Sequence, residues 1–234
     1  MIFYILSTIW AILYSIIILP LFIFMPLSIR IKCAVFGTHV LLYLCDVIDG
    51  ITYEIKGKEH LPMQPYIVAS EHQSPLETLI LFTVFKNAVY VLKKEVIILP
   101  IFNIFFILLK MIFIDRSKKL QALKKMLKLS KLRFDEGRTI IIFPQGSRTT
   151  INKKAQYKSG VAALYSSLSV PVVPIALNTG LFWPRSLVSF KKKPGKAIIK
   201  ILPPINPGLS KQEFLQQLKK NLSEASYTLC NEQQ

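Results

Sequence analysis

The 234-residue sequence has few cysteines and lacks the common motifs that carry an enzyme nucleophile. Cys33, Cys45 and Cys230 have neither the spacing of metal ligands nor an evident disulfide pairing, so a reducing compartment suits them. The sequence has no G-x-S-x-G elbow, no P-loop and no H-E-x-x-H motif, and no cysteine–histidine pair can be defended. These absences argue against a serine-hydrolase elbow, a P-loop nucleotide site and a zincin-type metal centre.

Histidine is equally scarce, with three residues in the chain. His39 lies among apolar residues, which is typical of a structural role, and His60 lies in a polar segment without a partner pattern. His72 is therefore the candidate for proton transfer.

The first 29 residues contain no charged side chain. A stretch of this length can cross a bilayer, which takes about 20 apolar residues. Pro20 and Pro26 should each kink or end a helix, so a re-entrant or interfacial arrangement is also open. No basic residue precedes the stretch and no small-residue cleavage site follows it, which argues against a signal peptide. We predict a helical membrane-associated element over residues 1–50 and an α/β domain over residues 51–234.

Acidic residues are also few, 13 against 30 basic ones, and the net charge is +17. Nucleic acid, an anionic membrane surface, and acidic small molecules or carrier proteins all suit such a bias. The apolar N-terminus favours the membrane, where each basic residue near anionic lipid contributes roughly 1 kcal/mol. Aromatic and basic residues are not interleaved as a stacking platform requires, so we expect no nucleic acid partner. Arg30 and Lys32, directly after the apolar stretch, favour a cytoplasmic position for the following domain.

Strand-like and helix-like segments alternate beyond residue 50. Runs typical of strands lie at 53–56, 66–70, 88–92, 111–114, 139–143, 170–177 and 197–202. Helical patterns lie after Ser74 and at 117–136, 159–168 and 210–229, and the apolar stretch 96–109 is broken by Pro100. The alternation predicts an α/β fold with a mainly parallel sheet flanked by helices.

The segment 117–136 is the clearest amphipathic helix, and Gly137 should end it. Its seven lysine and arginine residues around the apolar arc indicate a solvated face, with contact to a membrane surface or an acidic partner as the alternative. The arc itself contains Leu120, Leu123, Met126, Leu127 and Phe134.

The stretch 69–77, Ala-Ser-Glu-His-Gln-Ser-Pro-Leu-Glu, joins a buried strand to a helix. Ser74 is typical of an N-cap, Pro75 of the first helical residue, and Glu77 of the third residue of a capping box. His72 thus lies at the carboxyl end of a strand, where open α/β sheets place their chemistry. Glu77 can orient the imidazole or serve only the capping box. Without an enzyme nucleophile, we expect His72 to act as general base on a substrate hydroxyl that attacks an activated acyl donor such as a thioester.

The run 143–148, Phe-Pro-Gln-Gly-Ser-Arg, is a second strand end with residues suited to an anion. Its glycine permits a tight turn, and Arg148 can hold a phosphate in a bidentate fork. Lys93 and Arg116, also at strand ends, can share that role. The alternative for Arg148 is a surface arginine in a turn.

Four stretches resemble, in order, the four motifs of the glycerolipid acyltransferases. The resemblance covers roughly residues 50–205, with supporting matches at 92–95, Pro100 and 174–184. The motifs are His-Gln-Ser-Pro-Leu-Glu at 72–77, Phe-Ile-Asp-Arg at 113–116, Phe-Pro-Gln-Gly-Ser-Arg at 143–148 and Val-Pro-Val-Val-Pro at 170–174.

The resemblance implies a role for each matching residue. His72 would be the base on a free sn-2 hydroxyl, and Glu77 would orient it. Arg148 would hold the phosphate of a lysophospholipid, with Lys93 as a second phosphate contact. The residues that would shape the acceptor site are Asp115, Arg116 and Gly146.

The implied reaction transfers a fatty acyl group from acyl-acyl carrier protein or acyl-CoA to 1-acyl-sn-glycerol 3-phosphate, which forms phosphatidic acid in phospholipid biosynthesis. The thioester is a co-substrate, and no metal or other cofactor is implied. The implied location is the cytoplasmic (inner) membrane of a bacterium, in contact with membrane lipid, with the catalytic domain on the cytoplasmic side. Two alternatives are an acyltransferase for glycerol 3-phosphate or a lyso-aminolipid, and a non-catalytic basic membrane-binding module.

The sequence departs from the family pattern at three positions. Glu77 stands where the family usually has Asp and is longer by about 1.5 Å, which the backbone must compensate because a misplacement of about 1 Å can cost on the order of 10² in rate. Gln145 replaces the usual Glu, and as a neutral amide that can donate a hydrogen bond it should leave phosphate binding intact. Lys110 stands where the second motif commonly has Gly, which alters the expected shape of that loop.

Overall fold

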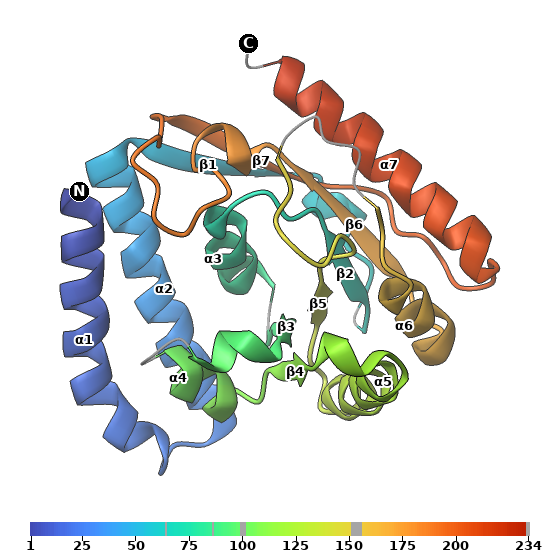
Figure 1. The fold of residues 1–234 in the computed structure, drawn as a ribbon, viewed down its shortest axis with the longest axis horizontal. Helices are drawn as coiled ribbons and strands as arrows, with labels where there is room; N and C mark the ends of the chain where they lie inside the picture. The colour runs from blue at the N-terminus through green and yellow to red at the C-terminus, as the bar shows by residue number, and fades with distance from the viewer. Residues whose placement is uncertain (64, 86, 99–101, 151–155, 233–234) are drawn as a thin grey trace.

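The structure, a computed structural model, describes residues 1–63, 65–85, 87–98, 102–150 and 156–232 (Figure 1). Within these ranges seven strands form one sheet, in the order β1, β7, β6, β2, β5, β3, β4. The strands are β1 (Ile51–Lys56), β2 (Ile67–Ser70), β3 (Val89–Lys93), β4 (Ile112–Ile114), β5 (Ile140–Ile142), β6 (Val172–Leu177) and β7 (Gly195–Ile201). The helices are α1 (Ile2–Phe22), α2 (Leu27–Asp49), α3 (Pro75–Val84), α4 (Phe102–Leu108), α5 (Lys119–Asp135), α6 (Gly160–Leu168) and α7 (Lys211–Asn231).

The sheet is mainly parallel, which confirms the predicted α/β fold. Only the β6–β7 pair is antiparallel among the described strand pairs. Strand β2 lies in the middle of the sheet and all four of its residues are buried, as a parallel strand covered on both faces requires. Strand β1 is an edge strand, and more buried and more exposed residues alternate along it.

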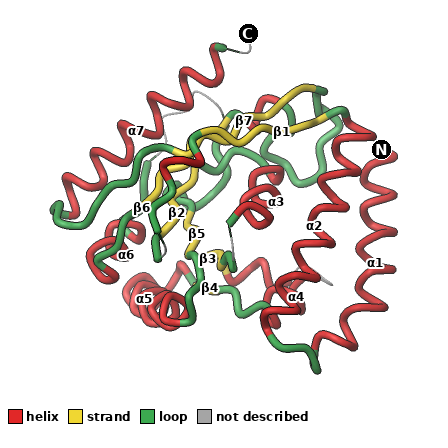
Figure 2. Tube along the Cα trace, turned by 180° about the vertical axis from the view of Figure 1, so that it is seen from behind, coloured by secondary structure: helices red, strands yellow, loops and turns green. Residues whose placement is uncertain are grey.

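Helices cover both faces of the sheet. Helices α5, α6 and α7 lie on one side, and α3 lies on the other with α1 and α2 outside it (Figures 1 and 2). Short 3₁₀ turns connect several elements at Lys58–His60, Lys94–Ile98, Arg116–Lys118 and Thr179–Leu181. The carboxyl ends of β2 and β5, which pair directly, bring two predicted motifs to one edge.

The two N-terminal helices are long and apolar enough to cross a membrane. Helix α1 continues two residues beyond Pro20, and Pro26 is the N-cap of α2. Large apolar side chains of α1, such as Ile16 and Ile17, remain more than 60% exposed. Such a surface indicates membrane association. The division into parts 1–50 and 51–234 stays a prediction.

Helix α5 begins at Lys119 and is amphipathic, as expected. Of the predicted apolar arc, Leu123, Met126 and Leu127 pack against the core, but Leu120 does not. The buried residues are Ala122, Met126 and Ser130, whereas Leu120 is 64% exposed. Leu120 precedes Ala122 by two residues, and two steps of 100° place it on the opposite side of the helix. Gly137 follows the helix with φ of 71°, as a C-terminal glycine should. Pro100, expected to break the apolar stretch 96–109, lies outside the described residues.

Candidate active site

The segment between β2 and α3 holds a buried carboxylate against the imidazole of His72. Glu77 Oε1 lies 2.8 Å from His72 Nδ1 and also accepts the backbone N–H groups of Gln73 at 2.9 Å and Ser74 at 2.8 Å. Its second oxygen, Oε2, accepts the Thr179 hydroxyl at 2.7 Å. Glu77 is fully buried. The carboxylate therefore closes the capping box and orients the histidine at the same time.

These contacts fix the tautomer of His72. The Glu77 carboxylate only accepts hydrogen bonds here, so the proton shared with it belongs to Nδ1 of the imidazole. The other ring nitrogen, Nε2, then carries the lone pair. The side chain is 15% exposed, which leaves part of the ring open to a substrate. This arrangement suits a general base.

The imidazole is also packed and its backbone anchored. It stacks on Phe143 with 4.0 Å between ring centroids, and Phe143 stacks in turn on Tyr90. The His72 N–H donates to Gln145 Oε1 at 2.7 Å. Both anchors, Phe143 and Gln145, come from the segment after β5, so the third motif supports the first.

Arg148 lies in the segment after β5, beside the histidine segment. The N–H of Thr149, the next residue, donates to the His72 carbonyl at 2.7 Å. The Arg148 Nη1 donates to the Arg185 carbonyl at 3.2 Å, while its Nε is buried without a hydrogen-bond partner in the described part of the chain. Burial lowers the pKa of Arg148, and the nearby Glu77 carboxylate opposes that shift. The segments that carry the imidazole and the guanidinium therefore both lie at the carboxyl end of the parallel strands β2 and β5.

The second predicted motif contacts the third through Arg116. Its Nη1 donates to the Gly146 carbonyl. Asp115 binds Lys94 at 2.7 Å and the Ser117 backbone at 3.1 Å, and its hydrogen bonds to Lys94 and Ser117 lower its pKa to about 2. Asp115 thus stabilises its own turn. Lys93 is exposed at the end of β3, which β5 separates from β2, so the structure does not bring it against His72.

Two residues beside the histidine were not anticipated. Gln73 is buried, donates to the Leu177 carbonyl at 2.8 Å and accepts the Gly180 N–H at 3.1 Å, so it ties the histidine segment to the end of β6. Thr179, which holds Glu77, follows the same strand. The position of Thr179, two residues after the predicted strand 170–177, was the available signal, since polar residues at strand ends meet at the carboxyl end of the sheet.

The structure accounts for the other two departures from the family pattern. The neutral amide of Gln145 was expected only to leave phosphate binding intact, and the structure shows its amide oxygen accepting the backbone N–H of His72. This is a bond that a glutamate can also form. Lys110 has φ of 57°, in the left-handed region that glycine adopts freely, and its carbonyl accepts Arg133 Nε at 3.1 Å. The lysine therefore keeps a glycine-like backbone.

Gly146 has φ of 74°, and a Cβ atom added there would lie 2.8 Å from Arg116 Nη1. We expect Gly146→Ala to lower the melting temperature of the purified protein. Gly137→Ala is the matched control, because Gly137 has φ of 71° with nothing within 4 Å of an added Cβ. The control should lose about 1–2 kcal/mol from backbone strain alone. Gly146→Ala should lose about 1 kcal/mol more, because the end of the Arg116 side chain must move and its hydrogen bond to the Gly146 carbonyl weakens. Equal melting temperatures would contradict the contact between Arg116 and this turn.

Glu71 is a buried carboxyl beside His72 that gives a pH dependence. Burial raises its pKa from 4.5 to about 7, although hydrogen bonds from Ser226 and Gln73 act in the opposite direction. Because the folded pKa is the higher one, the stability from protonated Glu71 is complete below about pH 4.5 and is lost as pH rises through 7.

We expect Glu71→Gln to remove this loss. The free energy of unfolding of the variant minus that of the parent protein should therefore be larger at pH 8 than at pH 5, by up to about 3 kcal/mol. Melting curves at both pH values measure the effect. A difference in melting temperature that does not change with pH would contradict it.

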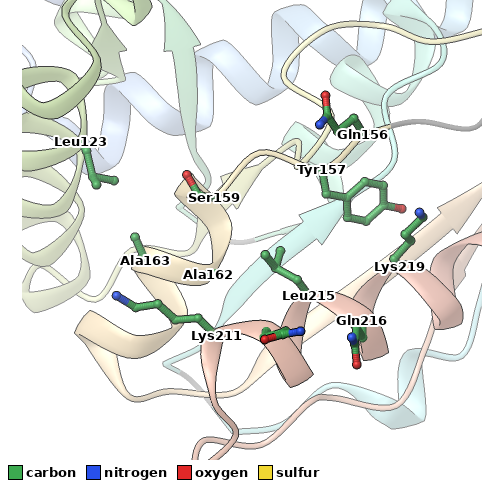
Figure 3. A pocket seen from close by; sticks show the side chains of 11 residues that line it. Leu123, Gln156, Tyr157, Ser159, Ala162, Ala163, Lys211, Leu215, Gln216 and Lys219 are labelled. Carbon is green, nitrogen blue, oxygen red and sulfur yellow. The ribbon is translucent and has the colours of Figure 1, made fainter.

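A groove of about 550 Å³ lies between α5, α6 and α7 (Figure 3). Lys211 and Lys219 of α7 lie along it, and Tyr157 lies on the same side as Lys219 in Figure 3. Burial raises the pKa of Tyr157, and the charge of Glu71 adds to that shift. None of the seven predicted site residues lines the groove. The groove is nevertheless close to the segment that carries Gln145. Lys158, which lies between the lining residues Tyr157 and Ser159, donates its backbone N–H to the Pro144 carbonyl.

Comparisons with known proteins place these features in a family context. The family model described as Acyltransferase matches residues 52–178. The chain is 36% identical over 162 residues to a 1-acyl-sn-glycerol-3-phosphate acyltransferase of Pseudomonas aeruginosa, covering 69% of this chain and 62% of that protein. A protein of the same name from Limnanthes alba is 31% identical, with 76% and 63% covered. The chain thus spans less than two thirds of these relatives.

The fold is shared with a solved structure. The crystal structure of the 1-acyl-sn-glycerophosphate (LPA) acyltransferase PlsC from Thermotoga maritima superposes with a TM-score of 0.79 and 22% sequence identity. The match covers 97% of this chain and 92% of that one. It therefore includes the two N-terminal helices together with the sheet.

Proposed function

We propose that this chain, which belongs to the acyltransferase family, transfers a fatty acyl group from a thioester to the sn-2 hydroxyl of 1-acyl-sn-glycerol 3-phosphate. The product is phosphatidic acid. The observation that carries the proposal is the hydrogen bond between Thr149 and the His72 carbonyl, since it holds the segment of Arg148 beside the imidazole–carboxylate pair. A base and a phosphate-binding cation on one edge suit an acceptor with a hydroxyl and a phosphate.

The proposed reaction is a direct transfer in which His72 Nε2 takes the proton of the acceptor hydroxyl as its oxygen bonds to the thioester carbonyl carbon. The tetrahedral intermediate then collapses, the carbon–sulfur bond breaks, and the imidazolium returns the proton to the leaving thiolate. Glu77 stabilises the transient imidazolium through the 2.8 Å contact with Nδ1. No bond between enzyme and acyl group forms.

The acceptor phosphate is assigned to Arg148. A buried Nε without a hydrogen-bond partner among the described residues supports this role, because a polar N–H in such a place gains most from an anionic acceptor. Lys93 is proposed as the second phosphate contact. Three residues are proposed to shape the acceptor site, namely Asp115, Arg116 and Gly146.

The acyl donor is proposed to be acyl-acyl carrier protein or acyl-CoA, with no metal or other cofactor. Both donors are acidic, and the basic exposed face of α5 and the lysines of the groove beside α7 support them. The two apolar N-terminal helices support contact with membrane lipid. We further propose the cytoplasmic membrane of a bacterium as the location, with the sheet domain on the cytoplasmic side.

The test is thiol release by the purified protein in detergent micelles with both donors and a panel of acceptors. Lysophosphatidic acid should give the highest kcat/KM, above glycerol 3-phosphate and above a lysolipid whose headgroup is an amine. Preference for an acceptor without phosphate would reject the proposed substrate. Absence of transfer to every acceptor would favour a non-catalytic basic membrane-binding module.

A further inference from the structure

Lys192 lies in a cage of three aromatic rings, two from the start of the chain and one from the segment just before it. Its Nζ is 3.3 Å from the ring centroid of Phe3, 3.8 Å from that of Trp183 and 4.5 Å from that of Tyr4. The same nitrogen binds Asp49 Oδ2 at 2.5 Å, and the side chain is only 6% exposed. The ammonium thus joins the start of α1, the end of α2 and the segment 182–193, which we name the cage segment.

The cage segment is attached to α1 by further contacts. The Tyr4 hydroxyl donates to the Ser189 carbonyl at 2.9 Å and accepts the Ser189 N–H at 2.6 Å. Within the segment, the N–H of Lys193 donates to the Phe182 carbonyl at 2.9 Å. The segment therefore forms a closed loop fixed at its base by Lys192 and on one side by Tyr4.

The same segment reaches the candidate active site. Arg185 belongs to it, and its carbonyl accepts Arg148 Nη1 at 3.2 Å. Trp183, one of the cage rings, is 3% exposed and lies two residues before Arg185. Its backbone N–H donates to the carbonyl of Thr179, the residue that binds Glu77. A short run of backbone therefore connects the caged ammonium with both Arg148 and the carboxylate of the catalytic pair.

We propose that Lys192 is a positioning residue for the acceptor site. This inference rests on the proposed function. By holding the cage segment against α1 and α2, it fixes the Arg185 carbonyl, and that carbonyl sets the direction of the Arg148 guanidinium. The ammonium is well suited to this task because three ring faces and one carboxylate attract it at the same point. Lys192 touches neither acceptor nor donor.

The experiment compares Lys192→Met with the parent protein in steady-state thiol release. Methionine keeps an unbranched apolar side chain and removes the charge. We expect the KM for lysophosphatidic acid to rise about tenfold, with kcat and the KM for the acyl donor changed less than about twofold. Lys192→Arg keeps a cation that can stack on aromatic rings and should restore the acceptor KM to within about threefold of the parent value.

Lys191→Met is the matched control, because Lys191 is the preceding residue, has the same charge and is exposed. It should leave both KM values unchanged. A second readout is independent of activity. The chain has two tryptophans, so in a Trp10→Phe background the emission of Trp183 reports on the cage, and it should change in Lys192→Met but not in Lys191→Met.

Three results would overturn the inference. They are an equal rise of both KM values, a loss confined to kcat, and unchanged kinetics in a variant whose Trp183 emission shows that the cage is broken. If Lys192→Met does not fold, Tyr4→Phe tests the same attachment by removing only the hydrogen bonds to Ser189, and its acceptor KM should rise about threefold. An unchanged acceptor KM in that variant would likewise count against the inference. A parent protein inactive toward lysophosphatidic acid would instead reject the proposed function.

Discussion

His72→Ala is expected to abolish acyl transfer, with a fall in kcat of about 10³ or more. General base catalysis contributes roughly 10²–10⁴, and His72 is the histidine whose Nδ1 is held by a buried carboxylate. The measurement is thiol release per mole of enzyme with saturating lysophosphatidic acid and acyl donor. A melting curve should show a folded protein, because the backbone contacts of residue 72 with Gln145 and Thr149 do not need the ring.

His39→Ala and His60→Ala are the matched controls for this substitution. Nδ1 of His39 bonds the Val35 carbonyl in α2 and Nδ1 of His60 bonds the Ile201 carbonyl, each at 2.9 Å and away from the site. Both variants should keep kcat within about threefold of the parent value. Unchanged transfer by a folded His72→Ala protein would exclude His72 as the base and leave the binding module as the better account.

Glu77→Gln should give the second large effect, a fall in kcat on the order of 10²–10³, with little loss of stability. The glutamine oxygen can replace Oε1, which accepts from the imidazole and two backbone N–H groups, while its NH₂ can donate to the Thr179 hydroxyl in place of Oε2. The geometry is then kept and only the negative charge is lost. The reaction builds up positive charge on the imidazole, so the loss should appear in kcat.

A second capping box in the chain provides the control for Glu77. Glu213 closes the box of α7 with Ser210 and has no histidine partner in the described structure. Glu213→Gln should therefore cost no activity, while its melting temperature reports the effect of the exchange on a cap. Similar kcat values for the Glu77→Gln and parent proteins would show that Glu77 serves only the helix. Glu77→Asp completes the series, because it withdraws the carboxylate by about 1.5 Å from a backbone fitted to glutamate.

The predictions that succeeded rest on residues close together in sequence. Ser74, Pro75 and Glu77 lie within four positions of one another, and the capping box that they predict is present. The same proximity indicates from the sequence that Glu77 can orient His72, and the structure contains this pair. Short-range stereochemistry thus determines the local structure of the segment 74–77.

The features that escaped prediction depend on contacts between distant segments. Lys192 meets Phe3 across most of the chain, and no periodicity indicates such a pair. Arg138 was not singled out, yet it is 3% exposed and donates to the carbonyls of Ala88 and Leu109, which lie beside β3 and β4. A strand was expected at 197–202 and is found as β7 at Gly195–Ile201, but its antiparallel pairing with β6 follows from the path of the segment before it. The orientation of Gln145 toward His72 likewise requires the pairing of β2 with β5.

The hydrogen bonds that His72 makes through its main chain have one more consequence. Its N–H and its carbonyl are both bound by the segment that carries Arg148, through Gln145 and Thr149. The separation of the two backbone segments that carry the imidazole and the guanidinium is therefore fixed by these hydrogen bonds, and the Arg185 carbonyl directs the guanidinium. We therefore expect the site to select acceptors by the distance between the reacting hydroxyl and the phosphate. It should reject lysolipids in which that distance is longer by one methylene.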